Sequence, residues 1–191
     1  PRECIALLRE RQTVVVKGNH DAACVNELDE RTFNPYARAA VAWTRTALSE
    51  DEKRWLRGLP LVATLEHCQV AHGTLHRPEL FDYIPTTYDA YLSLQLLESS
   101  VCFLGHSHVP INFVWEEMIS FNYDREIDLK PNVKMLVNVG SVGQPRDDNP
   151  KAAYAVYDSE TRKIEIRRLD YDVESAAKKI REAGLPAAPG E

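Results

Sequence analysis

Three short histidine-containing motifs are the places where this chain could do chemistry. They are Gly-Asn-His-Asp at 18–21, His-Gly at 72–73 and Gly-His-Ser-His at 105–108, and they hold four of the six histidines. Imidazole nitrogens combined with amide or carboxylate oxygens suit Mn, Fe, Co, Ni or Zn better than calcium. A lone histidine is usually structural, but histidines that cluster at strand ends are candidate ligands. The three motifs therefore predict a site for divalent metal.

Each motif directly follows a short apolar run with the composition of a buried β-strand. These runs are Thr13–Lys17, Gln69–Ala71 and Val101–Leu104. Open α/β sheets carry functional groups on the loops beyond the carboxyl ends of their strands, so we expect the three loops to meet in one crevice. The glycine in each motif allows the sharp turn that such a loop needs.

The rest of the chain supplies helices early and strands late. Further strands are expected at Leu61–Leu65, Val133–Val139, Ala153–Tyr157 and Ile164–Arg168, and the last two form a hairpin through a turn at Asp158–Thr161. Helices are expected at Pro1–Arg11, from Asn34 to about Leu48, from Ser49 to near Gly58, at Tyr88–Leu97 and at Asp172–Gly184. This order predicts a layered α/β protein with helices outside sheets.

Length and composition indicate one globular domain. The 191 residues suit a single domain over 1–185 with a helical excursion at about 34–58, followed by a disordered tail at 186–191. No apolar stretch approaches the ~20 residues of a membrane span, so no membrane partner is expected. The formal charge of −6 argues against an extended nucleic-acid-binding surface. Cys68 and Cys102 are interpreted as buried free thiols, which fits a reducing cytoplasm.

The order of the motifs resembles that of a known family. Gly-Asn-His-Asp, His-Gly and Gly-His-Ser-His, each after an apolar strand, together resemble the calcineurin-like metallophosphoesterase superfamily. Asn138–Arg146 and Tyr154–Asp158 extend the similarity to its small bacterial and archaeal phosphodiesterase-like branch. The resemblance implies an α/β fold of two packed mixed β-sheets flanked by helices.

The resemblance also implies roles for individual residues. The ligands that it implies for a second metal are Asn19, His72 and His106. His108 matches a ligand of a first metal, and His20 matches the histidine that touches the substrate phosphate and assists the leaving group.

Three further residues are candidates for supporting or substrate-binding roles. Asp21 is expected to support its loop through hydrogen bonds. Arg146 follows two glycines and could hold a substrate phosphate, although a surface arginine in a turn is the alternative interpretation. His76 lies four residues after His72 in a segment with Gly73 and Pro78, which favours a loop facing substrate over a helical metal pair.

One departure from the family pattern affects the metal site. Family members begin with an Asp-x-His strand and then a Gly-Asp turn whose aspartate bridges both metals, and Pro1–Gln12 contains neither histidine nor aspartate. The resemblance therefore implies an N-terminally truncated chain that lacks the first strand-helix-strand unit, together with the first-site and bridging ligands. The helix Pro1–Arg11 would be the one that normally follows the Gly-Asp turn.

The expected activity is hydrolysis of a phosphodiester, a phosphomonoester or a nucleotide polyphosphate. Two divalent ions, most simply Mn, would share a hydroxide that attacks phosphorus, and the partner would be a small-molecule or nucleotide phosphoester. The alternative is a truncated, catalytically inactive binding module with the same fold. A zinc hydrolase of another class is disfavoured, because HxHxDH and HExxH are absent from the sequence.

Overall fold

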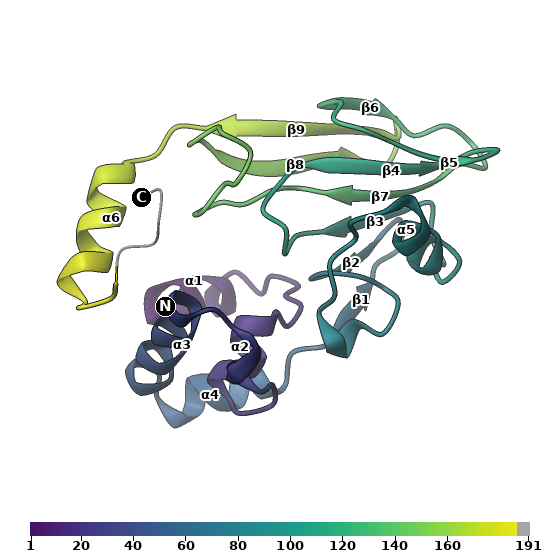
Figure 1. Ribbon diagram of the computed structural model, residues 1–191. Coiled ribbons are helices and arrows are strands. Elements are labelled where there is room, and N and C mark those ends of the chain that lie inside the picture. Colours follow the sequence, from purple (N-terminus) through teal and green to yellow (C-terminus); the bar gives the residue numbers. More distant parts are fainter. Residues whose placement is uncertain (187–191) are drawn as a thin grey trace. The chain divides into compact units, whose positions relative to one another are not determined.

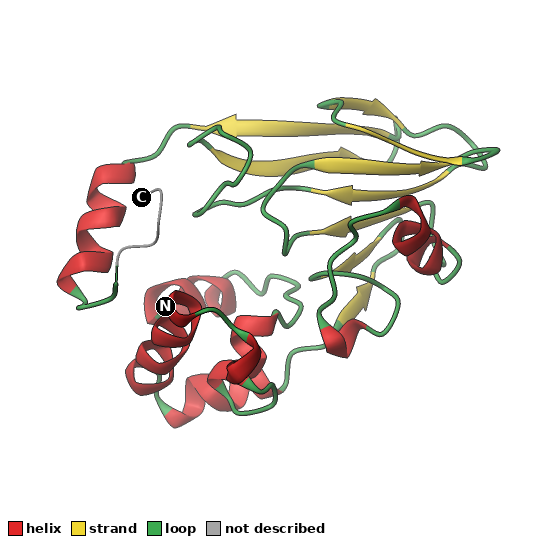
Figure 2. Ribbon diagram, in the orientation of Figure 1, coloured by secondary structure: helices red, strands yellow, loops and turns green. Residues whose placement is uncertain are grey.

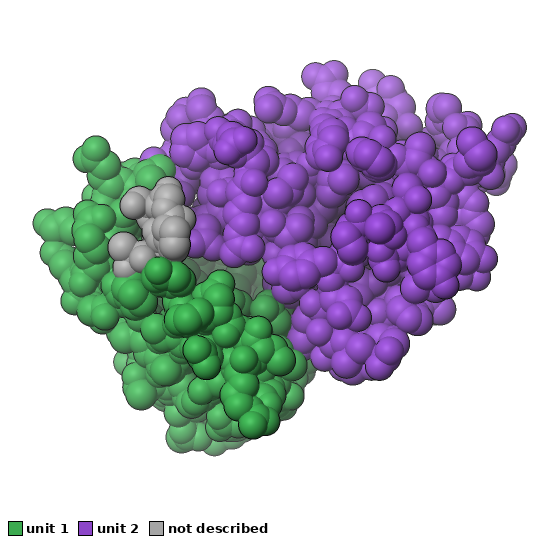
Figure 3. Space-filling model, viewed as in Figure 1, with its two compact units in different colours: residues 1–60, 172–191 green, residues 61–171 purple. Residues whose placement is uncertain are grey.

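The computed structural model describes residues 1–186 (Figure 1), and the chain divides into two compact units (Figure 3). Unit 1 contains residues 1–60 together with the segment from Asp172 onward, and unit 2 contains residues 61–171. The predicted tail at 186–191 lies outside the described residues, apart from Pro186. The prediction of a single domain over 1–185 stays a prediction.

Unit 1 is built from helices, and Figure 2 shows no strand in its described part. Its helices are α1 (Arg2–Glu10), α2 (Asn19–Cys24), the 3-10 helix η1 (Glu30–Thr32), α3 (Pro35–Ala47), α4 (Glu50–Arg57) and α6 (Val173–Glu182). The expected caps are present: Asn34 Oδ1 accepts a hydrogen bond from the Ala37 N–H at 2.8 Å, and Ser49 forms a capping box with Glu52. Ile5, Val25, Leu48 and Leu56 form one buried cluster of this unit.

Two sequence predictions in unit 1 are wrong. Thr13–Lys17 is not a strand, because no strand within residues 1–186 pairs with it; its backbone instead bonds through the Lys17 N–H to the Pro60 carbonyl at 2.8 Å. A β-branched run cannot form a ladder without a neighbour. In addition, the Gly-Asn-His-Asp motif does not form a simple turn, since Gly18 is the N-cap of α2 and Asn19 is its first residue.

Unit 2 contains two sheets. The larger sheet has the order β1-β2-β3-β7-β4-β5, in which β2, β3 and β7 are parallel and the remaining pairs are antiparallel. Its strands are β1 (Val62–Thr64), β2 (Gln69–Ala71), β3 (Val101–Leu104), β4 (Ile111–Trp115), β5 (Ile119–Asn122) and β7 (Lys134–Asn138). The smaller sheet has the order β6-β9-β8 and is antiparallel, with β6 (Glu126–Asp128), β8 (Ala152–Asp158) and β9 (Lys163–Leu169). The family resemblance implied that both sheets are mixed, but the smaller sheet is antiparallel within the described residues.

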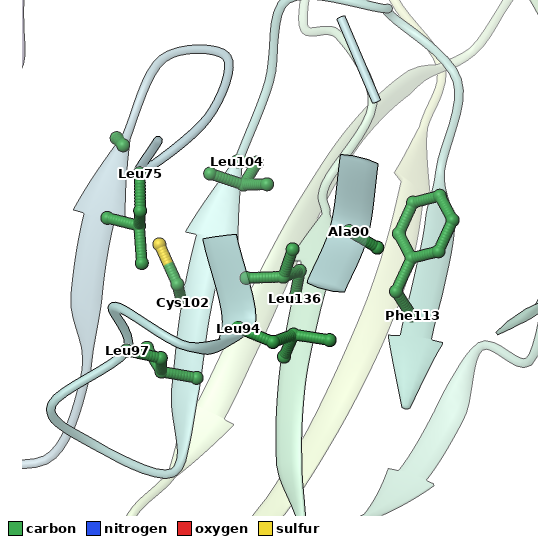
Figure 4. Close-up of a cluster of buried hydrophobic side chains, with 9 residues drawn as sticks. Leu75, Ala90, Leu94, Leu97, Cys102, Leu104, Phe113 and Leu136 are labelled. Atoms are coloured by element: carbon green, nitrogen blue, oxygen red, sulfur yellow. The ribbon is translucent and has the colours of Figure 1, made fainter. Parts of the chain in front are cut away.

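The larger sheet has a buried cluster on each face. On one face, Ala90 and Leu94 of α5 (Thr87–Leu94) pack against Leu104, Phe113 and Leu136, as Figure 4 shows. A second cluster joins the two sheets, and its members include Val101, Met135, Val137, Ile164 and Ile166. The predicted arrangement of two packed sheets with helices outside is confirmed.

Three strands of unit 2, β4, β5 and β6, were missed in the sequence analysis. The sequence analysis predicted none of these three strands, although they complete both sheets. Helix α5 also ends at Leu94, three residues before the predicted Leu97. The β8–β9 hairpin, in contrast, has the predicted turn, and the Asp158 carboxylate accepts hydrogen bonds from the Glu160 and Thr161 N–H groups.

Candidate metal and phosphoester site

The candidate site of unit 2 lies at the carboxyl ends of β2, β3 and β7. Because these three strands are parallel, the residues that follow them share one edge of the larger sheet. The Gly105 N–H donates to the His72 carbonyl at 2.9 Å, and the Val139 N–H donates to the Leu104 carbonyl at 2.9 Å. The ladder thus continues past the strand ends and brings the His-Gly and Gly-His-Ser-His loops side by side, as predicted.

The imidazole rings of His72 and His106 are within hydrogen-bond distance of each other. His72 Nε2 lies 3.0 Å from His106 Nδ1, and the two ring centroids are 4.8 Å apart. Two imidazole nitrogens at about 2.1 Å from one ion, at roughly a right angle, would be about 3.0 Å apart. The pair therefore has the spacing of two adjacent ligands of a single divalent ion.

Aromatic side chains fix the orientation of this histidine pair. The His106 ring stacks on Tyr83 with centroids 4.0 Å apart, and the edge of Phe81 lies against His72 at 6.1 Å. Rings held in this way lose little further freedom when a ligand binds, so the pair is preorganised.

The Gly-His-Ser-His loop has a strained backbone that Asn138 stabilises. His106 and His108 have φ angles of 65° and 62°, a left-handed conformation that costs a non-glycine residue about 1–2 kcal/mol. Asn138 Nδ2 donates to the Gly105 carbonyl and, at 3.0 Å, to Ser107 Oγ, while Asn138 Oδ1 accepts from the Gly140 N–H at 3.0 Å. The sequence analysis gave Asn138 no role of this kind; its position at the end of a buried strand was the available signal.

His108 is held by the segment that joins β7 to β8, which we call the 140–151 loop. His108 Nδ1 lies 2.7 Å from the Gln144 carbonyl oxygen, and the Arg146 N–H donates to the His108 carbonyl at 3.2 Å. A carbonyl oxygen only accepts, so His108 Nδ1 carries the proton and Nε2 presents a lone pair. Histidines that bind metal typically donate their other ring N–H to a carbonyl or carboxylate oxygen in this way.

The three motif histidines of unit 2, His72, His106 and His108, line the same pocket, whose volume is about 480 Å³. Apolar and aromatic side chains also line it, and they include Phe103, Val139, Tyr154 and Tyr157. The structure therefore brings together His72, His106 and His108, three of the residues that the sequence singled out.

The other motif lies in unit 1. Asn19 and His20 are the first two residues of α2, and the His20 ring stacks on Phe33 with centroids 5.1 Å apart. Asp21 Oδ2 accepts a hydrogen bond from the N–H of Gly18, the N-cap of α2, at 2.9 Å, which stabilises the first turn of this helix. Burial raises the pKa of Asp21, while the Gly18 hydrogen bond and the charge of Lys17 act in the opposite direction. A shared site for these residues and the histidines of unit 2 stays a prediction.

The two candidate substrate residues have different surroundings. Arg146 is exposed, and its Nη2 donates to Gln144 Oε1 at 3.0 Å, within the same loop that contacts His108. His76 is half-buried, and its N–H points to Thr74 Oγ1 at 3.1 Å and Ser93 Oγ at 3.3 Å, which tie its loop to α5. Roles for both in binding substrate stay predictions.

Comparison with known proteins defines the class. A family model described as the calcineurin-like phosphoesterase superfamily domain matches residues 2–162. The chain belongs to this superfamily. Its members are hydrolases that generally use divalent metal ions.

Individual relatives agree with this assignment. An uncharacterized protein of Methanocaldococcus jannaschii is 34% identical over 196 residues, which cover 100% of this chain and 79% of that protein. The structure is similar to a metallophosphoesterase from Sphaerobacter thermophilus, with a TM-score of 0.81 and 32% identity over 96% of this chain and 77% of the other. A hypothetical protein from Pyrococcus horikoshii has the same fold, with a TM-score of 0.72 and 19% identity over 96% of this chain and 73% of that one.

Proposed function

We propose that the protein hydrolyses a phosphodiester, a phosphomonoester or a nucleotide polyphosphate with the help of two divalent metal ions. The observation that carries this proposal is the 3.0 Å separation of His72 Nε2 and His106 Nδ1, in a pocket that His108 also lines. Membership of the calcineurin-like phosphoesterase superfamily supports the reaction class.

The proposed metal ligands are the residues that the family resemblance assigns. His72 and His106 would hold one ion with Asn19, and His108 would hold the other through Nε2. Nitrogen ligands of this kind suit Mn, Fe, Co, Ni or Zn, and we favour Mn. When bound, two such ions would lower the pKa of water, so that hydroxide is available as the nucleophile at neutral pH.

The side chains of the chain itself would bind substrate and move a proton. His20 would donate a hydrogen bond to a phosphoryl oxygen and a proton to the leaving oxygen, and Asp21 would hold the start of α2 in place. Arg146 is exposed beside the loop that contacts His108, where its guanidinium can pair with a substrate phosphate, and His76 is the second candidate contact.

The expected partner is a small-molecule or nucleotide phosphoester, and the expected location is the cytoplasm. Within residues 1–186 no helix is long and apolar enough to cross a membrane. All four cysteines are free thiols, which supports a reducing compartment.

A second candidate is a binding module with the same fold and no catalysis. One observation favours it: residues 1–186 contain no group of three or more His, Cys, Asp or Glu side chains arranged to hold a metal ion. Such a protein would bind one ion at the His72–His106 pair and release a phosphoester unchanged.

A comparison of His106→Ala with His20→Ala tests the proposal. Bound Mn²⁺ and turnover would be measured together on a nitrophenyl diester, which has an activated leaving group, and on an unactivated nucleotide diester. His106→Ala should lose metal and activity together, because it removes a ligand. His20→Ala should keep its metal and lose about 10²–10⁴-fold in turnover, with the smaller loss on the nitrophenyl diester.

Two results would contradict the proposal. Metal loss in His20→Ala as complete as in His106→Ala would overturn the division of roles. Mn²⁺ binding by the unmodified chain without hydrolysis of any phosphoester would favour the binding module.

A further inference from the structure

The 140–151 loop is anchored by a residue far from any motif. Arg168 lies on β9, opposite Ala153 of β8, and its side chain is only 9% exposed. Its guanidinium forms a two-pronged ion pair with the Asp147 carboxylate, whose side chain is 19% exposed. Arg168 Nη1 also donates to the Lys151 carbonyl at 3.2 Å, so one guanidinium ties down two points of the loop.

The anchored part of the loop adjoins the part that holds His108. Asp147 directly follows Arg146, whose N–H donates to the His108 carbonyl, and it lies three residues after Gln144, whose carbonyl accepts from His108 Nδ1. Gln144 itself is exposed, and Gly143 and Val142 before it are exposed too. Ser141 Oγ accepts hydrogen bonds from the Gly143 and Gln144 N–H groups on one side of the Gln144 carbonyl. On the other side, Arg168 of the smaller sheet anchors the loop at Asp147 and Lys151.

We propose that the Asp147–Arg168 ion pair is a positioning element that keeps His108 in the tautomer with its proton on Nδ1. With the pair intact, the Gln144 carbonyl stays at Nδ1 and the proton stays on that nitrogen. Without it, the loop relaxes, the Nδ1 hydrogen bond is lost, and the imidazole exchanges between its two tautomers. The consequence for catalysis rests on the proposed function, whereas the tautomer itself does not.

The test reads the imidazole nitrogens of His108 by ¹⁵N NMR in the metal-free protein, above the pH at which histidines are charged. The His108 signals are assigned by their absence in His108→Gln. The unmodified chain should give two separate signals, one from a protonated and one from an unprotonated nitrogen. Asp147→Asn should bring them together into the averaged pair of a ring in rapid tautomer exchange.

Two further variants make the test specific. Arg168→Met keeps an apolar stem of similar size in the sheet but removes the charge, and it should give the same averaged signals as Asp147→Asn. Asp148→Asn makes the identical chemical change one residue along, at an exposed side chain, and should leave the two signals separate.

Separate His108 signals in both folded variants overturn the inference, whether or not the protein hydrolyses phosphoesters. Averaged signals in Asp148→Asn as well also overturn it, because the effect would then not depend on the ion pair. If the unmodified chain has no phosphoesterase activity but the signals respond as expected, the positioning role stands and the proposed function fails. Restored separate signals in Asp147→Glu, which keeps the carboxylate, support the proposal.

Discussion

Gly73 is the position where a single added methyl group should disturb the histidine pair. It follows His72 directly, and a Cβ atom built there would lie 2.8 Å from the Asp82 carbonyl oxygen and 3.4 Å from Cδ2 of His106. The first distance is too short for any real contact, and a backbone oxygen cannot rotate out of the way. Gly73→Ala must therefore shift either the His-Gly loop or the segment at 81–82.

The size of the effect follows from this geometry. Overpacking a filled site costs typically 1–3 kcal/mol, so we expect Gly73→Ala to lose about 2 kcal/mol of unfolding free energy. The shift should also disturb the 3.0 Å spacing between His72 Nε2 and His106 Nδ1. Displacement of ligand supports of this kind reduces metal affinity roughly 10–100-fold.

Urea unfolding and calorimetric titration with Mn²⁺ would measure the two effects. Gly143→Ala is the matched control, because a Cβ atom there meets nothing within 4 Å. Its stability should stay within about 0.5 kcal/mol of the unmodified chain. If Gly73→Ala has the same urea midpoint and the same Mn²⁺ affinity as Gly143→Ala, the steric reasoning is wrong.

Three more predictions concern the core and the thiols. Leu136 is fully buried between α5 and its neighbouring strands, so Leu136→Ala should cost about 2–5 kcal/mol in urea unfolding, whereas Val142→Ala, at a side chain that is 72% exposed, should cost almost nothing; equal costs would refute the assigned core. In native protein at pH 8, a thiol reagent should modify Cys4 alone, because Cys24, Cys68 and Cys102 are buried, and four modified thiols without denaturant would contradict this burial. Burial, with a smaller contribution from Cys68, raises the pKa of Cys102 to about 12 from 9.0. The folded state therefore retains a proton that the unfolded chain loses, and stability should fall as pH rises from 9.0 towards about 12. Cys102 alone contributes up to roughly 1.4 kcal/mol per pH unit, and a flat urea midpoint over this range would refute the shift.

Local chemistry allowed several elements to be predicted from the sequence. Asn34 and the Ser49–Glu52 capping box satisfy N–H groups within a few residues of themselves, so their helices begin where the sequence predicts. Apolar runs that end in a glycine-containing polar loop likewise predicted β2 and β3 correctly. The meeting of the His-Gly and Gly-His-Ser-His loops follows from one general property of parallel strands, namely that their carboxyl ends share an edge.

Other features depended on partners that are distant in sequence. Thr13–Lys17 has strand composition but no pairing strand among residues 1–186. In contrast, β4 contains the polar residue Asn112 and is still a strand, because β5 and β7 pair with both of its edges. Strand formation depends on such pairing as much as on composition.

The contacts that orient the histidines also depend on residues that are distant in sequence. The tautomer of His108 is set by a carbonyl 36 positions away, and the loop that carries this carbonyl is anchored by Arg168 on another sheet. Residue types and spacing were thus enough to predict which imidazoles come together in unit 2. The direction of their lone pairs was decided by the tertiary structure alone, because a hydrogen bond between distant segments forms only once both are in place.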